Sequence, residues 1–194
     1  MNSALFVVAA VSLLVTPGPT NTLLATSGAS AGVRRSAHLL VAELGGYLLA
    51  IALLRALLGP MIAATPMLGE LLRMAATIYL IYLAIALWHH GNQQTYENAP
   101  VDFIRVFVTT LLNPKAIIFA LTLLPSPIDF LGLLPWLFGL SALIVTVGTG
   151  WIIVGRVLGR GLSGIVSGNT GYRLSAVALA LLAGVIGSQL LRLT

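Results

Sequence analysis

Six long apolar segments follow one another along the chain, separated by short stretches rich in glycine, proline and charged residues. A helix needs about 20 apolar residues to cross the hydrocarbon core of a bilayer. The pattern therefore predicts an all-α polytopic membrane protein with six transmembrane helices, at residues 4–27, 37–58, 67–89, 101–125, 132–155 and 172–192. The links are short, which predicts a single transmembrane domain over residues 1–194.

The composition supports a membrane protein. Only 8% of the 194 residues are charged, whereas 58% are hydrophobic. Soluble domains carry about 25% charged residues, so a soluble protein of this composition could not solvate its own surface. The net charge of +5 is better explained by orientation in a membrane than by binding to nucleic acid. The absence of cysteine excludes a disulfide framework, a Cys-ligated zinc site and a thiol nucleophile.

The positions of the arginines predict the orientation of the chain in the membrane. Cytoplasmic loops carry an excess of Lys and Arg near the span ends. The links after the first, third and fifth predicted spans contribute six arginines, Arg34, Arg35, Arg105, Arg156, Arg160 and Arg173. The opposite side contributes three, Arg55, Arg73 and Arg192. This asymmetry predicts that both termini lie outside the cytoplasm.

Proline interrupts two of the predicted spans. Pro17-Gly18-Pro19 lies in the first span and Asn113-Pro114 in the fourth. Proline inside a helix removes an N–H donor and clashes with the carbonyl four residues earlier. Bare backbone is costly in lipid and persists only where protein or a water-lined cavity covers it. Two such breaks in an apolar chain are typical of a transport site.

The two broken spans also indicate an internal repeat. The third and sixth predicted spans both begin with an arginine, in segments 73–76 and 173–176. The expected halves, about 1–92 and 100–194, hold three spans each. Because three is an odd number, the second half must be inserted upside down. Inverted repeats with interrupted helices are a recurrent transporter architecture, with the binding site near the midplane.

The first break frees backbone carbonyls. Pro17 and Pro19 cannot donate hydrogen bonds, so the carbonyls of Leu13 and Val15 are expected to lose their helical partners. Gly18 lets the chain turn where a side chain would clash. A freed carbonyl could accept a hydrogen bond from an ammonium group. A proline kink that merely shapes helix packing is the alternative.

The residues after the first break are expected to supply the partial positive charge of a helix N-terminus. Thr20, Asn21 and Thr22 are expected to form the first turn of a restarted helix, whose N–H groups suit a carboxylate. The side chains of Thr16, Thr20 and Asn21 add hydroxyl and amide groups at the same depth. Together with the freed carbonyls, these groups predict a site for a zwitterion such as an amino acid.

The second break carries a lysine far from either end of its apolar segment. Pro114, which follows Asn113, should free the carbonyl of Thr110. Lys115 comes next, and a cation inside the membrane is expensive, so it usually marks a functional site or an ion pair. The alternative is that Lys115 extends to a membrane interface.

Glu43 is the acid that lies well inside the second predicted span. A partner-free buried carboxylate favours its neutral form, whereas a nearby Lys115 would favour the ionised form. Either state could serve proton coupling, so Glu43 is the proton-coupling candidate. The alternative is a static contact of Glu43 with Lys115 or an amide that fastens two helices.

Two further groups of residues are expected to pack helices together. Small residues permit close helix contact in bilayers, which is the expected role of Gly45, Gly46, Gly148 and Gly150. Packing is also the preferred interpretation for Tyr47, Tyr79 and Tyr82, although these side chains could line a transport pathway.

Several motifs resemble those of a known transporter family. They are Thr16-Pro17-Gly18-Pro19-Thr20-Asn21, Gly32-Val33-Arg34-Arg35 and Asn113-Pro114-Lys115-Ala116-Ile117-Ile118-Phe119. With the segment 75–88, they make the chain similar over essentially its full length to the LysE/RhtB-type amino-acid exporter family. The resemblance implies a six-span exporter of the bacterial inner membrane that moves amino acids or related metabolites outward, driven by the proton gradient. The chain departs from the family pattern at Glu43, and a glycine often found shortly before Asn113-Pro114 is absent.

The preferred function is a secondary exporter of an amino acid or similar small zwitterion. Its expected substrate-binding residues are Thr16, Pro17, Gly18, Pro19, Thr20, Asn21, Asn113, Pro114 and Lys115. A passive small-solute channel and a non-transporting scaffold protein remain alternatives. An enzyme is disfavoured because few ionisable side chains are available for acid–base work. No cofactor, metal or nucleic-acid partner is expected, and two copies could pair in the bilayer, although no feature requires it.

Overall fold

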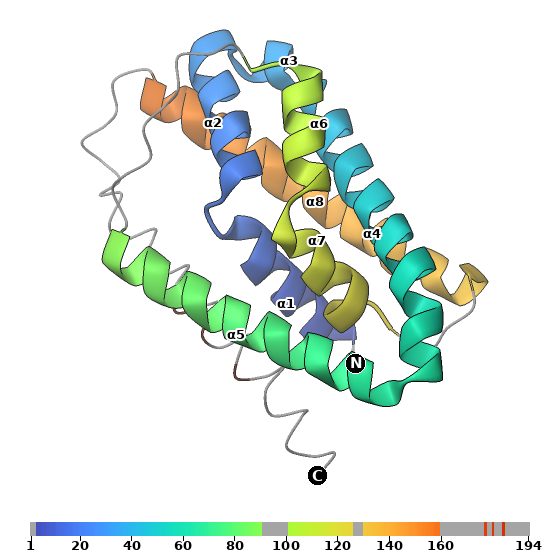
Figure 1. Cartoon of the computed structure of the whole chain (residues 1–194). Helices are drawn as coiled ribbons and strands as arrows, with labels where there is room; N and C mark the ends of the chain where they lie inside the picture. The colour runs from blue at the N-terminus through green and yellow to red at the C-terminus, as the bar shows by residue number, and fades with distance from the viewer. Residues whose placement is uncertain are drawn as a thin grey trace.

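The computed structural model describes residues 3–90, 101–125 and 130–159, with single positions 177, 180 and 184. In this part of the chain every regular element is a helix, as predicted (Figure 1). The elements are α1 (Ser3–Val15), α2 (Pro19–Ala31), α3 (Val33–Ser36), α4 (Leu39–Ala64), α5 (Pro66–His90), α6 (Phe103–Leu111), α7 (Pro114–Ile118), the π-helix η1 (Phe119–Leu123) and α8 (Phe130–Gly159). Apart from the three single positions, the predicted span at 172–192 lies outside the described residues.

Both predicted helix breaks are confirmed. The chain bends by 63° between α1 and α2, and by 47° between α6 and the helical segment formed by α7 and η1. Two continuous segments, Val33–Ile62 and Leu131–Leu158, are long and apolar enough to cross a membrane, and each bent pair could supply one more span. The described helices therefore give two to four candidate spans. The predicted third span forms the single helix α5, but α5 is not among these candidates.

The link predicted between the second and third spans is shorter than expected. Pro60 lies inside α4, which continues to Ala64 instead of ending near residue 58. Proline removes one helical hydrogen bond, but the helix resumes beyond it, and the Thr65 N–H bonds to the Met61 carbonyl at 2.9 Å. Pro66 then starts α5, where its missing N–H has no helical partner to lose.

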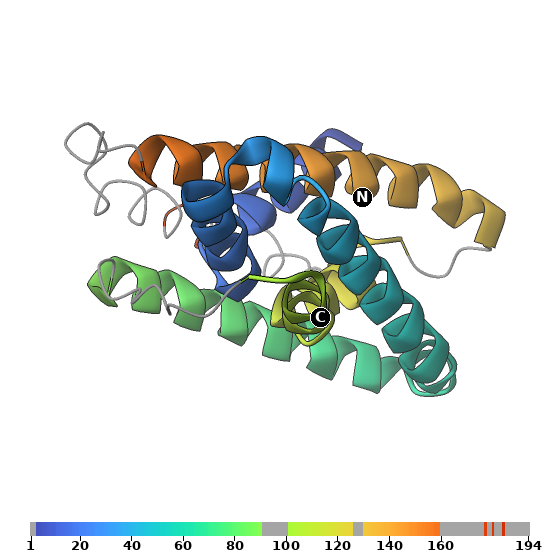
Figure 2. The same cartoon turned by 90° about the horizontal axis from the view of Figure 1, so that it is seen from above.

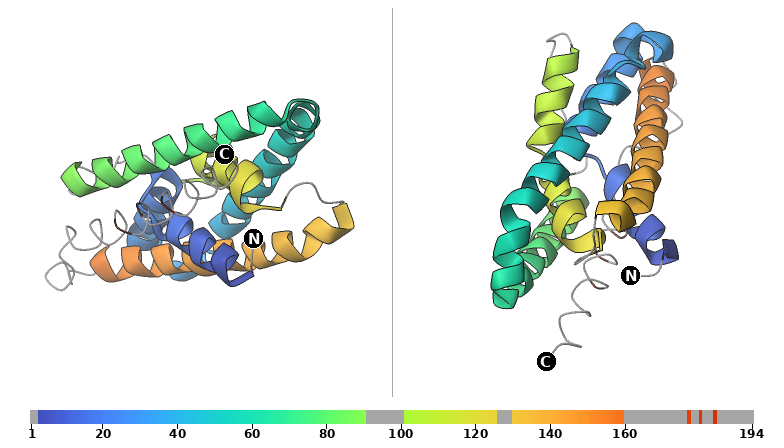
Figure 3. Two further views of the ribbon diagram at one scale, coloured as in Figure 1. Left: turned by 90° about the horizontal axis from the view of Figure 1, so that it is seen from below. Right: turned by 90° about the vertical axis from the view of Figure 1, so that its right-hand side faces the viewer.

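The broken helices lie between two long helices. Figures 2 and 3 show α8 and α5 on opposite sides of the molecule, with both breaks between them. The α2 helix packs most extensively against α8, and α4 packs along α6. This arrangement brings the first and fourth predicted spans together, although they are far apart in sequence.

Glycines set the closest helix contacts. A Cβ on Gly28 would overlap the backbone of Ile152, and one on Gly155 would overlap the backbone of Ala25, so α2 and α8 touch through their main chains. A Cβ on Gly46 would lie 2.8 Å from Thr110 Cβ, which confirms the close contact expected there.

Other glycines give a mixed result. A Cβ on Gly148 would overlap the Glu43 carboxylate, so this position is also closely packed. A Cβ on Gly45 would make ordinary contact with the Phe107 ring, at 3.5 Å. Among the described residues, a Cβ on Gly150 would meet nothing within 4 Å, so the close contact expected there is not found in this part of the chain. The presence of a glycine in an apolar segment does not reveal which face of the helix it occupies.

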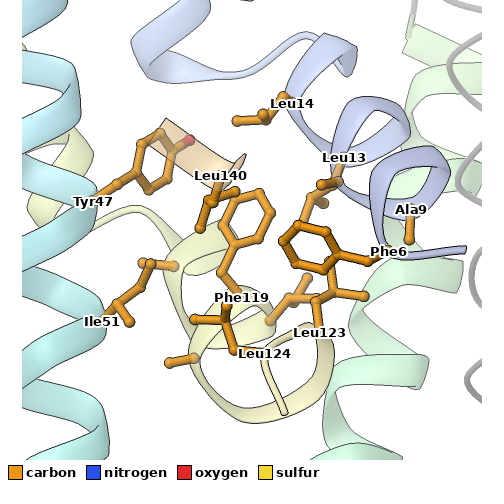
Figure 4. Close-up of a cluster of buried hydrophobic side chains, with 14 of the residues drawn as sticks. Phe6, Ala9, Leu13, Leu14, Tyr47, Ile51, Phe119, Leu123, Leu124 and Leu140 are labelled. Carbon is orange, nitrogen blue, oxygen red and sulfur yellow. The ribbon is translucent and has the colours of Figure 1, made fainter. Parts of the chain in front are cut away.

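A hydrophobic cluster fills the space beside the breaks (Figure 4). Tyr47 of α4 meets Phe119 of η1 edge to face, with ring centroids 5.7 Å apart, and Phe6 of α1 meets Trp136 of α8 in the same way at 5.0 Å. Further buried members labelled in Figure 4 are Ala9, Leu13, Leu14, Ile51, Leu123, Leu124 and Leu140. The polar atoms at the breaks therefore border an apolar core.

Candidate functional site

Asn21 closes the first break with its side chain. Gly18 connects α1 to α2 in an extended conformation, with φ −171° and ψ 174°. The Asn21 amide Nδ2 donates hydrogen bonds to the Leu14 carbonyl at 2.7 Å and to the Thr16 carbonyl at 2.8 Å. Asn21 is buried, and it replaces helical donors that are lost where α1 ends.

The carbonyls that Asn21 binds are neighbours of those singled out in the sequence. The prolines predicted the loss of helical partners at Leu13 and Val15, and the side chain of Asn21 binds the carbonyls of Leu14 and Thr16. The reason is that α1 ends at Val15, and the whole last turn of a helix lacks donors for its carbonyls, not only the positions four residues before a proline.

Asn113 organises the second break. Its Oδ1 caps α7 by accepting a hydrogen bond from the Lys115 backbone N–H at 3.0 Å. Its Nδ2 donates to the Thr20 hydroxyl at 3.2 Å and, at a longer 3.4 Å, to the Tyr47 hydroxyl. The Thr110 carbonyl is not left free as expected, because the Asn113 backbone N–H bonds to it at 3.0 Å in a tight turn.

Besides the bond from Asn113 to Thr20, two further direct contacts join the two breaks. The hydroxyls of Thr20 and Thr110 lie 3.1 Å apart. The Lys115 ammonium of α7 donates a hydrogen bond to the Thr16 carbonyl at 2.6 Å. Only 4% of Lys115 is exposed, so its side chain is buried in the protein and does not extend to an interface.

The structure thus gathers the residues expected at the site. Thr16, Thr20 and Asn21 from the first break join Asn113 and Lys115 from the second, and all five are buried. The remaining members of the expected set form the backbone of the breaks: Pro17, Gly18, Pro19 and Pro114.

Glu43 reaches the same region from α4. Its carboxylate packs against Gly148 of α8, is 1% exposed, and its Oε2 has no hydrogen-bond partner among the described residues. Tyr47, one turn after Glu43 on α4, bonds to Asn113, so this face of α4 lies beside the second break. Among the described residues, no direct ion pair joins Glu43 to Lys115.

Sequence reasoning missed two members of the polar cluster. Packing was the preferred interpretation for Tyr47, with a place along the transport pathway as the alternative, and its hydroxyl also accepts the Asn113 hydrogen bond. Thr110 was noted only for its carbonyl, whereas its hydroxyl faces Thr20. Helical spacing offered a signal, because Tyr47 lies one turn after Glu43 and Thr110 nearly one turn before Asn113, and such neighbours share a helix face.

The arrangement places groups that suit opposite charges on either side of Gly18. The site combines the start of α2, which favours an anion, with a backbone carbonyl that already accepts an ammonium. Hydrogen bonds are stronger in apolar surroundings than in water. Within the described part of the chain, no group of three or more His, Cys, Asp or Glu side chains could hold a metal ion.

Comparison with known proteins identifies relatives. The family model described as LysE type translocator matches residues 11–194. The chain is 28% identical over 155 residues to the cysteine/O-acetylserine efflux protein of Escherichia coli K12, with 75% of this chain and 78% of the relative covered. The proteins of the same description from Shigella flexneri serotype 5b and Shigella sonnei match to the same extent. No solved structure is significantly similar.

Proposed function

The chain belongs to the LysE type translocator family, and we propose that it is a secondary exporter of an amino acid or a similar small zwitterionic metabolite. The family consists of membrane translocators, which confirms that the chain is not an enzyme. Export out of the cytoplasm, the zwitterionic substrate and proton coupling are the parts of this function that require experiments.

One observation carries the proposal. Two broken helices from distant parts of the sequence meet in one buried polar cluster, in which the Lys115 ammonium bonds to the Thr16 carbonyl and Asn113 bonds to Thr20. Transporters place their substrate sites where interrupted helices meet near the midplane. A proline that merely kinked a helix would need no polar partner from the other break. Here polar side chains join the two breaks across 93 and 99 residues of sequence.

The set expected from the sequence supplies most of the proposed substrate-binding residues, with two additions. They are Thr16, Pro17, Gly18, Pro19, Thr20, Asn21, Asn113 and Pro114, extended by Tyr47 and Thr110. Lys115, the remaining member of the expected set, is proposed to act through the Thr16 carbonyl that it occupies, not by contacting the substrate. The efflux proteins similar to this chain are described as acting on cysteine and O-acetylserine. Both compounds are small zwitterions, so they are the first substrates to test.

Glu43 is the proposed proton carrier. Its buried carboxylate has an oxygen without a hydrogen-bond partner among the described residues, and proton coupling needs a group that gains and loses a proton during the cycle. In proteoliposomes with an imposed proton gradient, Glu43→Gln should abolish coupled transport while leaving expression intact. Coupled flux equal to that of the wild type would reject Glu43 as the carrier.

We further propose the full architecture that the sequence predicted. It has six spans in two inverted repeats, about residues 1–92 and 100–194, in the bacterial inner membrane with both termini outside the cytoplasm. Reporter fusions that are active only on one side of the membrane test this orientation at each terminus. A cytoplasmic signal from either terminus would overturn it.

The experiment that tests the function is efflux from cells loaded with a labelled panel of amino acids and dipeptides, including cysteine and O-acetylserine. The wild type should export at least one zwitterion faster than cells without the protein, and Asn113→Ala should not. Ser30→Ala is the matched control, because Ser30 is exposed on α2 and should leave export unchanged. Export of no panel compound would overturn the proposal, and flux insensitive to the proton gradient would indicate a passive channel.

A further inference from the structure

An ammonium group already lies at one of the two helix ends that form the site. The Lys115 ammonium bonds to the carbonyl of Thr16, which directly follows the last residue of α1. The C-terminal end of a helix carries a partial negative charge and suits a cation. The start of α2, across Gly18, suits a carboxylate instead. An α-amino acid carries its ammonium and carboxylate on one carbon, so it could span these two adjacent helix ends.

A substrate ammonium at this carbonyl would compete with Lys115 for the same space. A Cβ on Gly18 would lie 3.5 Å from both Cε and Nζ of Lys115, so the end of the lysine side chain lies directly over the backbone of the break. The Thr16 carbonyl also accepts the Asn21 amide. A second ammonium can therefore reach Thr16 only if Lys115 moves away.

A displaced lysine would need a new partner, because an unpaired buried charge is strongly destabilising. Glu43 is the buried acid among the described residues, and its Oε2 has no hydrogen-bond partner there. Tyr47, one turn after Glu43 on α4, bonds to Asn113, which caps the helix that carries Lys115. Glu43 and Lys115 form no direct pair. Glu43 thus offers an acceptor on the helix face that lies beside the second break.

We propose that Lys115 is an internal cation with two positions. In the empty carrier its ammonium occupies the Thr16 carbonyl, and an incoming substrate ammonium displaces it toward Glu43. This inference rests on the proposed export of a zwitterion and assigns the ammonium subsite to the Thr16 carbonyl. It follows that the carrier selects ligands with a free ammonium group, and that Lys115 restores the empty state after the substrate leaves.

A double-mutant cycle on the purified protein tests the proposal. The probe is labelled O-acetyl-L-serine, or the amino acid with the fastest export if the panel identifies another. Lys115→Met should bind the probe at least as tightly as the wild type, because the carbonyl is free, but should transport it more slowly. Glu43→Gln should weaken binding about tenfold, the effect of one hydrogen bond to a charged group. In the Lys115→Met background, Glu43→Gln should change affinity less than about twofold, because the coupling has been removed.

Two results would overturn the inference. Loss of binding in Lys115→Met would mean that the lysine contacts the substrate directly, and an equal effect of Glu43→Gln in both backgrounds would exclude the exchange. Lys115→Leu serves as a second variant if Lys115→Met does not fold, as judged by size-exclusion chromatography. The N-acetyl derivative of the probe lacks the ammonium and should not bind to the wild type; binding as tight as that of the probe would also overturn the inference.

The outcomes separate this inference from the proposed function. A wild type that neither exports nor binds any panel compound refutes the exporter itself. A wild type that exports the probe, combined with loss of binding in both lysine variants, refutes only the internal-cation role and leaves the exporter intact.

Discussion

Replacing Asn21 tests the chemistry of the first break most sharply. Asn21→Ala removes the amide that bonds to the Leu14 and Thr16 carbonyls at 2.7 and 2.8 Å. A buried polar group left without its partner costs about 1–3 kcal/mol. The Thr16 carbonyl keeps the Lys115 ammonium and should lose only about 0.5–1.5 kcal/mol, the value of one ordinary hydrogen bond. The expected loss in the free energy of unfolding is therefore about 1.5–4.5 kcal/mol, the sum of these two ranges.

The assay is reversible unfolding of the purified protein in bicelles by titration with SDS. Asn21→Asp should be at least as destabilised as Asn21→Ala, because a carboxyl oxygen would then face two carbonyl oxygens. The matched control is Ser30→Ala on the same helix, whose exposed hydroxyl bonds to the Thr26 carbonyl; it should change stability by less than about 0.5 kcal/mol. The reasoning is refuted if Asn21→Ala unfolds within about 0.5 kcal/mol of the wild type, a typical surface effect.

Three further predictions concern other parts of the fold. Gly155→Ala should destabilise the protein in the same unfolding assay by about 1–3 kcal/mol, because its Cβ would overlap the backbone of α2. Gly150→Ala on the same helix, whose Cβ would meet no described residue within 4 Å, should have a smaller effect; equal effects of the two substitutions would contradict this packing. Replacing both Pro17 and Pro19 by Ala should straighten the first span and lower efflux, so full activity in that variant would show the break to be incidental. Arg55→Met removes hydrogen bonds to the carbonyls of Ala120 and Pro125, at 3.2 and 2.8 Å. It should lower the unfolding free energy by about 1–3 kcal/mol, and an unchanged midpoint of the SDS titration would show that these bonds do not stabilise the end of the second broken helix.

Local chemistry made the helix breaks predictable. Proline removes a helical N–H donor and clashes with the carbonyl four residues earlier, so Pro17, Pro19 and Pro114 marked both bends before any packing was known. Asn113 and Lys115 were recognisable for a related reason, because polar side chains in the middle of an apolar segment need partners. Pro60 and Pro135 show that a proline alone does not end a helix. Pro60 lies near the end of α4, which continues to Ala64, and Pro135 lies inside α8.

What the sequence could not supply was the rotation of each helix relative to its neighbours. Gly150 and Gly155 are both glycines in the same apolar helix, yet of the two it is Gly155 that faces the backbone of α2. Tyr47 was predicted to pack, and its ring does meet Phe119, but its hydroxyl reaches Asn113 across 66 residues of sequence. Such contacts depend on which faces of distant helices meet. The pattern of one segment alone does not specify that.

The central claim is that the two helix breaks form one substrate site. The chain has no cysteine, so the pair Thr20→Cys and Thr110→Cys can be oxidised without background, and its disulfide detected by mass spectrometry. The native hydroxyl oxygens lie 3.1 Å apart, so small side-chain movements would bring two cysteine sulfurs at these positions within bonding distance. We expect rapid cross-linking that the transported amino acid slows, whereas Thr20→Cys paired with Thr146→Cys, exposed on α8, should not cross-link. Failure of the Thr20–Thr110 pair to cross-link, or cross-linking at the same rate with and without substrate, would contradict the claim.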